Sequence, residues 1–262
     1  MAIPYSDRCE RSEVAHVRKF VAYVKRRLND TRYYPPGEGY RYMVALALYS
    51  KAITVAEATL ALVDAGFSDE AFGMTRTLID ISFTLHYIAN QDTDERARRY
   101  AEFSFKDADV WNEVVKLYWP QKLRPLDAQT ARIASTYPHP HYWSGKRLKD
   151  LALEPDNHEL DPATGKPIVH DFHYKAVFRW TSHYVHPTIA ALSNHLVQAG
   201  HDPFEVNSGR NRKDMSHYAL FNVAAYIAAT VLRFHRCMGD LPPSRVNSWA
   251  TALIKHLARR HA

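Results

Sequence analysis

Apolar residues recur along most of the chain at the spacing of α-helices. The first such run extends from about Ser12 to Asn29 and leaves the opposite face of the helix basic. Two longer runs follow, from Tyr40 to Ala65 and from Asp69 to about Asn90, and Gly66 lies between them. Because glycine is well suited to the left-handed end of a helix, we expect these two runs to form an antiparallel helical hairpin.

Four further segments carry the same signal. One begins at Thr93 and ends before Trp119-Pro120, and a second covers Phe172 to Val185. Met215 to Met238 is long and nearly apolar, and the last segment begins at Pro242-Pro243. The chain between the first two is less regular, with one short basic helix near residues 146–153.

These segments predict an all-α protein. We expect a single-domain helical bundle of about seven to eight helices, in which the long hairpin packs on the Phe172 and Met215 helices. Residues 1–39 would form an N-terminal amphipathic helix and linker, and residues 40–262 the helical bundle domain, as one domain overall. Only nine glycines among 262 residues argue against many short, turn-linked strands.

Charge and cysteine content narrow the classes of partner. Lys and Arg total 34 against 28 Asp and Glu, and the pI is near 9.2, which is compatible with a phosphate-bearing partner such as RNA. Cys9 and Cys237 stand far apart and predict a reducing cytoplasm without a disulfide framework. We expect no export signal, because charged residues occupy positions 7–13, where a signal peptide needs an apolar core. We expect no membrane partner, since residues 218–232, the most apolar window, are too short for a span.

The densest polar chemistry lies in the Phe172 helix and just after it. If Phe172 to Val185 is helical, Arg179, His183 and His186 project from one face. Pro187 biases the preceding residue away from helical geometry, so we expect a helix boundary beside His186.

Arg179, six intervening residues and His186 form a spacing that resembles the ribonuclease motif of the higher-eukaryote and prokaryote nucleotide-binding (HEPN) helical domains. The resemblance implies metal-independent cleavage of RNA at the two-fold interface of a homodimer, as in a toxin or a phage-defence effector. His186 would act as general base and Arg179 as phosphate clamp, with His183 or Ser182 assisting. The alternative is a structural ion pair for Arg179 and a core position for His186.

A broader resemblance covers about residues 40–196. Ala-Gly-Phe followed by Arg-Thr-Leu-Ile-Asp (65–80), Tyr-Trp-Ser-Gly (142–145) and Ser-His-Tyr-Val-His-Pro (182–187) resemble a bacterial all-helical family, domain of unknown function 5677. That resemblance implies an α-helical bundle and no particular activity. The binding residues that it implies are Arg76, Asp80, Tyr142 and Trp143, together with Ser182 and His186.

Arg76 and Asp80 stand one helical turn apart and predict a local ion pair, with Glu57 and Asp64 as further partners. A second hypothesis follows from these residues: a non-catalytic helical module that binds a small ligand or a protein partner around Arg76, Asp80, Trp143 and His186.

Metal binding is the weaker candidate. His170 with His173, and His183 with His186, repeat at three-residue spacing, but the Glu-x-x-His pairs of di-iron bundles are absent. The sequence contains no phosphate loop, dinucleotide fingerprint or nucleophile elbow, so we predict neither a metal nor a cofactor.

Overall fold

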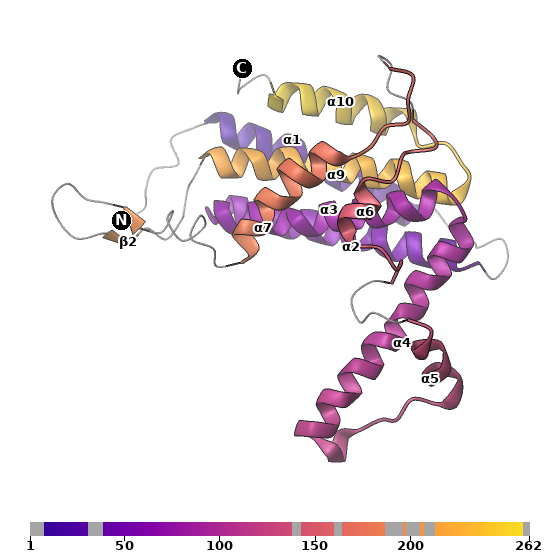
Figure 1. Ribbon diagram of the computed structural model, residues 1–262. Coiled ribbons are helices and arrows are strands. Elements are labelled where there is room, and N and C mark those ends of the chain that lie inside the picture. The colour runs from indigo at the N-terminus through magenta and orange to yellow at the C-terminus, as the bar shows by residue number, and fades with distance from the viewer. Residues whose placement is uncertain are drawn as a thin grey trace.

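Helices make up almost all of the regular structure in the computed structural model, which describes residues 8–30, 39–137, 143–159, 164–186, 196–197, 205–206 and 213–258 (Figure 1). The all-α class predicted from the sequence is confirmed. A two-residue antiparallel ladder between Leu196–Val197 (β1) and Glu205–Val206 (β2) is the one sheet among these residues, and it is too small to alter the class.

The centre of the bundle is the predicted hairpin of α2 (Tyr40–Asp64) and α3 (Ser68–Asn90). Gly66 turns the chain with a φ of 79°, in the left-handed region that glycine tolerates. The N–H of Phe67 reaches back to the carbonyl of Leu62 at 2.9 Å, which closes the end of α2. Most of α3 is buried around its whole circumference, as expected for the innermost helix of a bundle.

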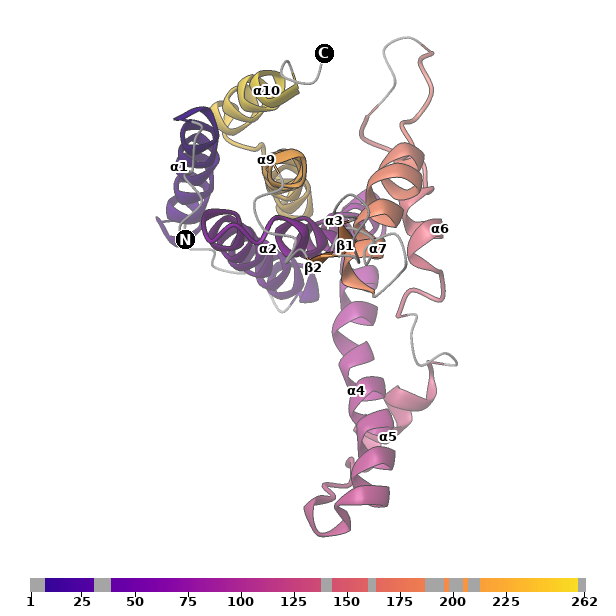
Figure 2. The same ribbon diagram turned by 90° about the vertical axis from the view of Figure 1, so that its left-hand side faces the viewer.

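Three helices enclose this hairpin on one side. The long helix α9 (Lys213–Met238) packs on both α2 and α3, and α1 (Arg8–Asp30) and α10 (Ser244–Ala258) cover it (Figure 2). Ion pairs from α1 hold Asp64, through Arg18, and Glu57, through Lys25 at 2.7 Å. The prediction that Glu57 and Asp64 are partners of Arg76 is therefore wrong, because α1 takes both carboxylates.

The Phe172 segment covers α3 from the other side. A π-helical turn (η2, His173–Phe178) runs directly into α7 (Arg179–Val185). A β-carbon on Gly73 would lie 3.3 Å from the backbone of Tyr184, so glycine lets α7 approach α3 closely. His186 is extended, with φ −106° and ψ 143°, which places the helix end beside His186, as predicted from Pro187.

The helix α4 (Thr93–Tyr118) begins against α2 and then leaves the bundle (Figures 1 and 2). A 3-10 turn (η1, Pro120–Lys122) and the helix α5 (Ala128–Ser135), which the sequence pattern did not predict, fold back onto it. We call residues 106–135 the arm. A short helix, α6 (Leu148–Ala152), returns the chain to α3.

Two of these helices are long and apolar enough to cross a membrane when judged by length and composition alone. In the most apolar window of α2, 50% of the residues are buried inside the bundle, and in that of residues 214–238 the share is 67%. Core helices of soluble bundles pass the same test, so this pair carries no conclusion about a membrane.

Candidate functional site

Arg76 and His186 meet at the interface between α3 and the end of α7. The distance from Nη1 of Arg76 to Nε2 of His186 is 3.0 Å, and the guanidinium carbon of Arg76 lies 4.8 Å from the centre of the Phe178 ring. Because a guanidinium only donates, Nε2 of His186 accepts this bond. Nε of Arg76 is buried and has no hydrogen-bond partner among the described residues. The guanidinium therefore keeps an unused donor beside an exposed imidazole.

Asp80 lies one turn further along α3. Burial raises the pKa of the Asp80 carboxyl to about 6, and the positive charge of Arg76 offsets this only in part. No ion pair within 4.0 Å joins the described side chains of Arg76 and Asp80, so the predicted local ion pair does not form. A carboxyl group that exchanges its proton near neutral pH therefore stands beside a cation.

An aromatic wall extends from Asp80 toward the segment after the arm. Burial raises the pKa of the Tyr100 phenol, and the nearby charges of Asp107 and Asp80 add to the shift. The indole of Trp143 packs edge-to-face on Tyr100, with ring centres 5.0 Å apart, and on Tyr87 at 5.5 Å. Trp143 thus reaches the site through Tyr100, whereas Tyr142 lies outside the described residues.

The residues expected on the face of α7 are all exposed but do not make the contacts predicted for them. Arg179, His183 and His186 are all exposed, so His186 is not the core histidine of the alternative interpretation. The guanidinium that contacts His186, however, belongs to Arg76 and not to Arg179. The hydroxyl of Ser182 donates to the carbonyl of Phe178 at 2.7 Å, a bond within the helix that occupies its proton.

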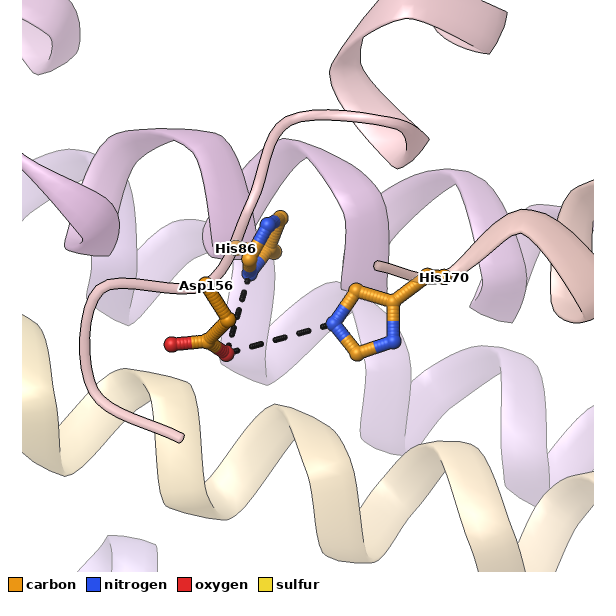
Figure 3. Close-up of side chains that lie close together, drawn as sticks. All are labelled: His86, Asp156 and His170. Atoms are coloured by element: carbon orange, nitrogen blue, oxygen red, sulfur yellow. Dashed lines mark ion pairs between the residues drawn. The ribbon is translucent and has the colours of Figure 1, made fainter. Parts of the chain in front are cut away.

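A second polar constellation lies in the interior, where the chain after α6 crosses α3 and α9 (Figure 3). His86 of α3 and His170 both point toward the same carboxylate oxygen of Asp156, at 3.5 Å from Nδ1 and 4.0 Å from Nε2. His86 and Asp156 are buried, and His170 is nearly so. With Arg233 and Arg236 of α9, these three residues form what we call the buried network.

The two arginines close this network. Arg233 places Nη2 3.0 Å from Nε2 of His170 and donates from Nη1 to the carbonyl of Ser82 at 2.8 Å. Arg236 donates to Oδ2 of Asp156 at 3.1 Å. Burial lowers the pKa of His170 to about 3, and the charge of Arg233 contributes to that shift.

The carboxylate of Asp156 is the acidic centre of the network. Burial would raise its pKa, but hydrogen bonds from His86 and from the N–H of His158, together with the charge of Arg236, outweigh burial. The pKa of Asp156 consequently lies well below its usual range. Asp156 is therefore ionised in the folded protein at neutral pH.

The nitrogen and oxygen atoms of His86, Asp156 and His170 are close enough to suggest a metal site, since three such atoms lie within 4.8 Å of one another. A cation would bind through the lone pairs of His170 Nε2 and Asp156 Oδ2. Arg233 and Arg236 already donate to these atoms, and their charges oppose a further cation. The geometry therefore supports a closed ion network that ties the segment after α6 to the bundle.

His170 and His173, which the sequence analysis considered as metal ligands, bind different partners. Nδ1 of His173 bonds the phenol oxygen of Tyr226 at 2.8 Å, while His170 turns to Asp156. The sequence did carry one signal of the buried network that periodicity overlooked. Arg233 and Arg236 interrupt an otherwise apolar helix, and buried arginines require partners.

Comparison with known proteins places the chain in a family. A family model described as "Family of unknown function (DUF5677)" matches residues 42–203, which is more than half of the chain. The chain belongs to this family. No curated protein matches it, and no solved structure does.

The DUF5677 region contains all but the first two residues of the hairpin, together with the arm and α7. Arg76, Asp80, Trp143 and His186 therefore lie within the family match, whereas Arg233 and Arg236 of the buried network come from the chain that follows it. The family description carries no activity. Function has to be argued from the geometry around Arg76.

Proposed function

We propose that the chain is a HEPN-like, metal-independent ribonuclease whose active site is formed by Arg76, Asp80 and His186. The observation that carries the proposal is the 3.0 Å contact between Arg76 and His186, one helical turn from a carboxyl group with a pKa of about 6. An imidazole, a guanidinium and a protonatable carboxyl can supply the base, the phosphate clamp and the acid for cleavage of RNA without a metal.

Binding of a phosphate would activate His186. Arg76 has an unused Nε donor, and when its guanidinium turns to two phosphate oxygens it releases the lone pair of Nε2 of His186. The imidazole then takes the proton of the ribose 2′-hydroxyl. The 2′-oxygen forms a bond to phosphorus while the bond from phosphorus to the 5′-oxygen breaks.

Asp80 completes the proton balance in this mechanism. In its protonated form the carboxyl donates to the departing 5′-oxygen, so the products are a 2′,3′-cyclic phosphate and a 5′-hydroxyl. Neither water nor a metal ion is consumed. The exposed Arg179 and His183 on α7 would contact neighbouring phosphates.

The biological setting belongs to the same proposal. A net charge of +6 suits an RNA substrate, because positive charge steers polyanions to the protein. We place the activity in the cytoplasm, as a toxin or phage-defence effector that works as a homodimer.

The aromatic wall favours a second candidate function, non-catalytic binding of a small ligand or a protein partner. Trp143 packs on Tyr100 and Tyr87, and Tyr100 lies near Asp80, one helical turn from Arg76, whose Nε has no partner among the described residues. An anionic group bound by Arg76 and an apolar group lying on Trp143 would satisfy both features.

The test is incubation of purified wild type, His186→Ala and His256→Ala with total RNA in EDTA, followed by analysis of the fragment ends. His256 is an exposed histidine of α10 and serves as the matched control. We expect cyclic phosphate ends from wild type and from His256→Ala, and at least a 100-fold loss for His186→Ala.

Two results would overturn the ribonuclease. One is a folded wild-type protein that leaves RNA intact, and the other is cleavage by His186→Ala at the wild-type rate. In the first case, stabilisation of wild type but not of Arg76→Ala by nucleotides or other phosphorylated ligands in a thermal-shift assay would support the binding module instead.

A further inference from the structure

The arm presents an apolar face that no described part of the chain covers. Leu117 and Tyr118 of α4 are 72% and 65% exposed. Helical spacing places both on one stripe with Val110, Trp111 and Val114, and Trp119 continues it. Singly exposed apolar residues are ordinary, but a continuous stripe of this kind marks an interaction surface.

A groove runs beside the stripe. Its volume is about 870 Å³, and it lies between the end of α4 and the chain that leads to α5. Trp111, Val115, Trp119, Leu123 and Leu126 are among the residues that line it. Stripe and groove together form one surface with a ridge and a hollow, which is the shape that interdigitating side chains need.

The exposed area is sufficient for an association between proteins. The large apolar side chains of the stripe offer roughly 500 Å². A stable interface buries about 800 Å² per partner, so the stripe with its polar border approaches that size. An apolar patch of this area is at the upper end of what a monomer exposes to water, and such patches are often functional.

We propose that a second copy of this chain covers the stripe, with the two α4 helices antiparallel about a two-fold axis near Val114. An apolar stripe is complementary to itself, as an isologous interface requires. The axis sets Trp111 against Leu117 of the second copy and Val110 against its Tyr118. This inference names the surface of the homodimer in the proposed function, but it is argued from the arm alone and does not require cleavage of RNA.

The distribution of charge favours this antiparallel arrangement. Asp107 is exposed at the beginning of the stripe, and the exposed Lys122 follows its end. Antiparallel pairing brings the acidic end of each stripe to the basic end of the other copy, whereas parallel pairing opposes like charges. Asp107 and Glu113 also make the stripe unsuitable for an anionic lipid surface.

Sedimentation equilibrium of the 262-residue chain tests the proposal. Wild type should be a dimer at micromolar concentration, and the double variant Trp111→Glu/Leu117→Glu should be a monomer, with a dissociation constant raised at least 100-fold. The matched control is Leu241→Glu, because Leu241 is 90% exposed and lies between α9 and α10, away from the arm. It should remain a dimer, and all three proteins should share one melting temperature within a few degrees.

Cross-linking tests where the axis lies. In a Cys9→Ser background, where Cys237 is buried, Val114→Cys should form a disulfide between copies on mild oxidation, and Leu241→Cys should not. A wild type that stays monomeric at 100 µM, or a double variant that dimerises like wild type, would overturn the proposal. Monomeric wild type that binds neutral vesicles through the stripe would assign it to lipid instead.

Discussion

The structure contains two arginine–histidine contacts of the same length in opposite environments. Arg233 meets His170, and Arg76 meets His186, each with 3.0 Å between guanidinium and imidazole nitrogens. The first pair lies in the buried network, where Ser82 and Asp156 supply further partners. In the second pair the imidazole is exposed to solvent, while Nε of Arg76 is buried and has no described partner.

The difference shows that environment, rather than residue type, assigns the role of a polar pair. In the interior most ionic and polar groups have partners, so removal of one member of a closed set destabilises the fold by leaving the others unpaired. At the surface the same contact costs little to open, and its donors remain available to a ligand. We therefore expect substitutions in the first pair to change stability and substitutions in the second to change activity.

The largest effect should follow from removing the charge at the centre of the buried network. Asp156→Asn removes the carboxylate that His86 and Arg236 share, although Arg236 keeps its pair with Glu159, and should lower the free energy of unfolding by about 3 kcal/mol. Urea denaturation at pH 7 measures this. Asp64→Asn, in the exposed pair with Arg18, should lose less than about 1 kcal/mol. Equal losses in the two variants would erase the distinction between buried and exposed pairs.

The next effect sharpens the comparison from the exposed side. Arg76→Ala should reduce RNA cleavage about 100-fold, because the guanidinium that contacts His186 no longer binds the phosphate. Its unfolding free energy should remain within about 1 kcal/mol of wild type. Arg179→Ala is the control and should reduce cleavage only a few-fold. If Arg179→Ala lost more cleavage than Arg76→Ala, the phosphate would be bound by Arg179, as the sequence motif alone suggests.

Asp80 provides a smaller effect with an informative sign. Its folded pKa of about 6 exceeds the value of about 4 expected when unfolded, so its ionised form destabilises the fold at pH 7. Asp80→Asn should therefore stabilise the protein by about 2 kcal/mol at pH 7 and by almost nothing at pH 4, while slowing cleavage. Melting curves at the two pH values measure this, and a destabilised variant at pH 7 would show that the carboxylate is structurally paired.

The sequence predicted the helices well, for reasons that are local. Apolar periodicity, Gly66 and the Trp119-Pro120 stop all act within a few residues, and α2, α3 and α4 begin and end near the predicted positions. Pro187 likewise predicted the boundary at His186. The helix α5 was missed because eight residues carry too short a pattern to stand out.

The contacts of the site could not be predicted in the same way. The bond between Arg76 and His186 joins positions 110 residues apart, and it depends on how α7 crosses α3 at Gly73. Family resemblance suggested that Arg76 and His186 converge, whereas spacing along α7 suggested Arg179 as the cation. Periodicity is silent about Asp156, which lies in a segment without regular structure until α3 and α9 enclose it.

The smallest effect concerns the acid response of the buried network. His170 has a pKa of about 3 when folded, because of burial and then Arg233, against about 6.5 when unfolded. Between pH 3 and pH 6.5 the His170 imidazole binds a proton in the unfolded chain but not in the folded protein, so the free energy of unfolding falls as the pH falls. The negative charge of Asp156 opposes this shift only in part. The expected loss from pH 7 to pH 5.5 is about 1 kcal/mol. His173, whose pKa burial also lowers, contributes in the same direction.

Asp80 has to be removed from this measurement, because its protonation near pH 6 stabilises the fold and opposes the loss. Urea midpoints of Asp80→Asn and of Asp80→Asn/His170→Gln should be compared at pH 7 and pH 5.5. The single variant should lose about 1 kcal/mol more than the double variant, since glutamine binds no proton. Identical losses would mean that His170 accepts a proton in the folded state. The contrast between the buried His170 and the exposed His186 would then be wrong.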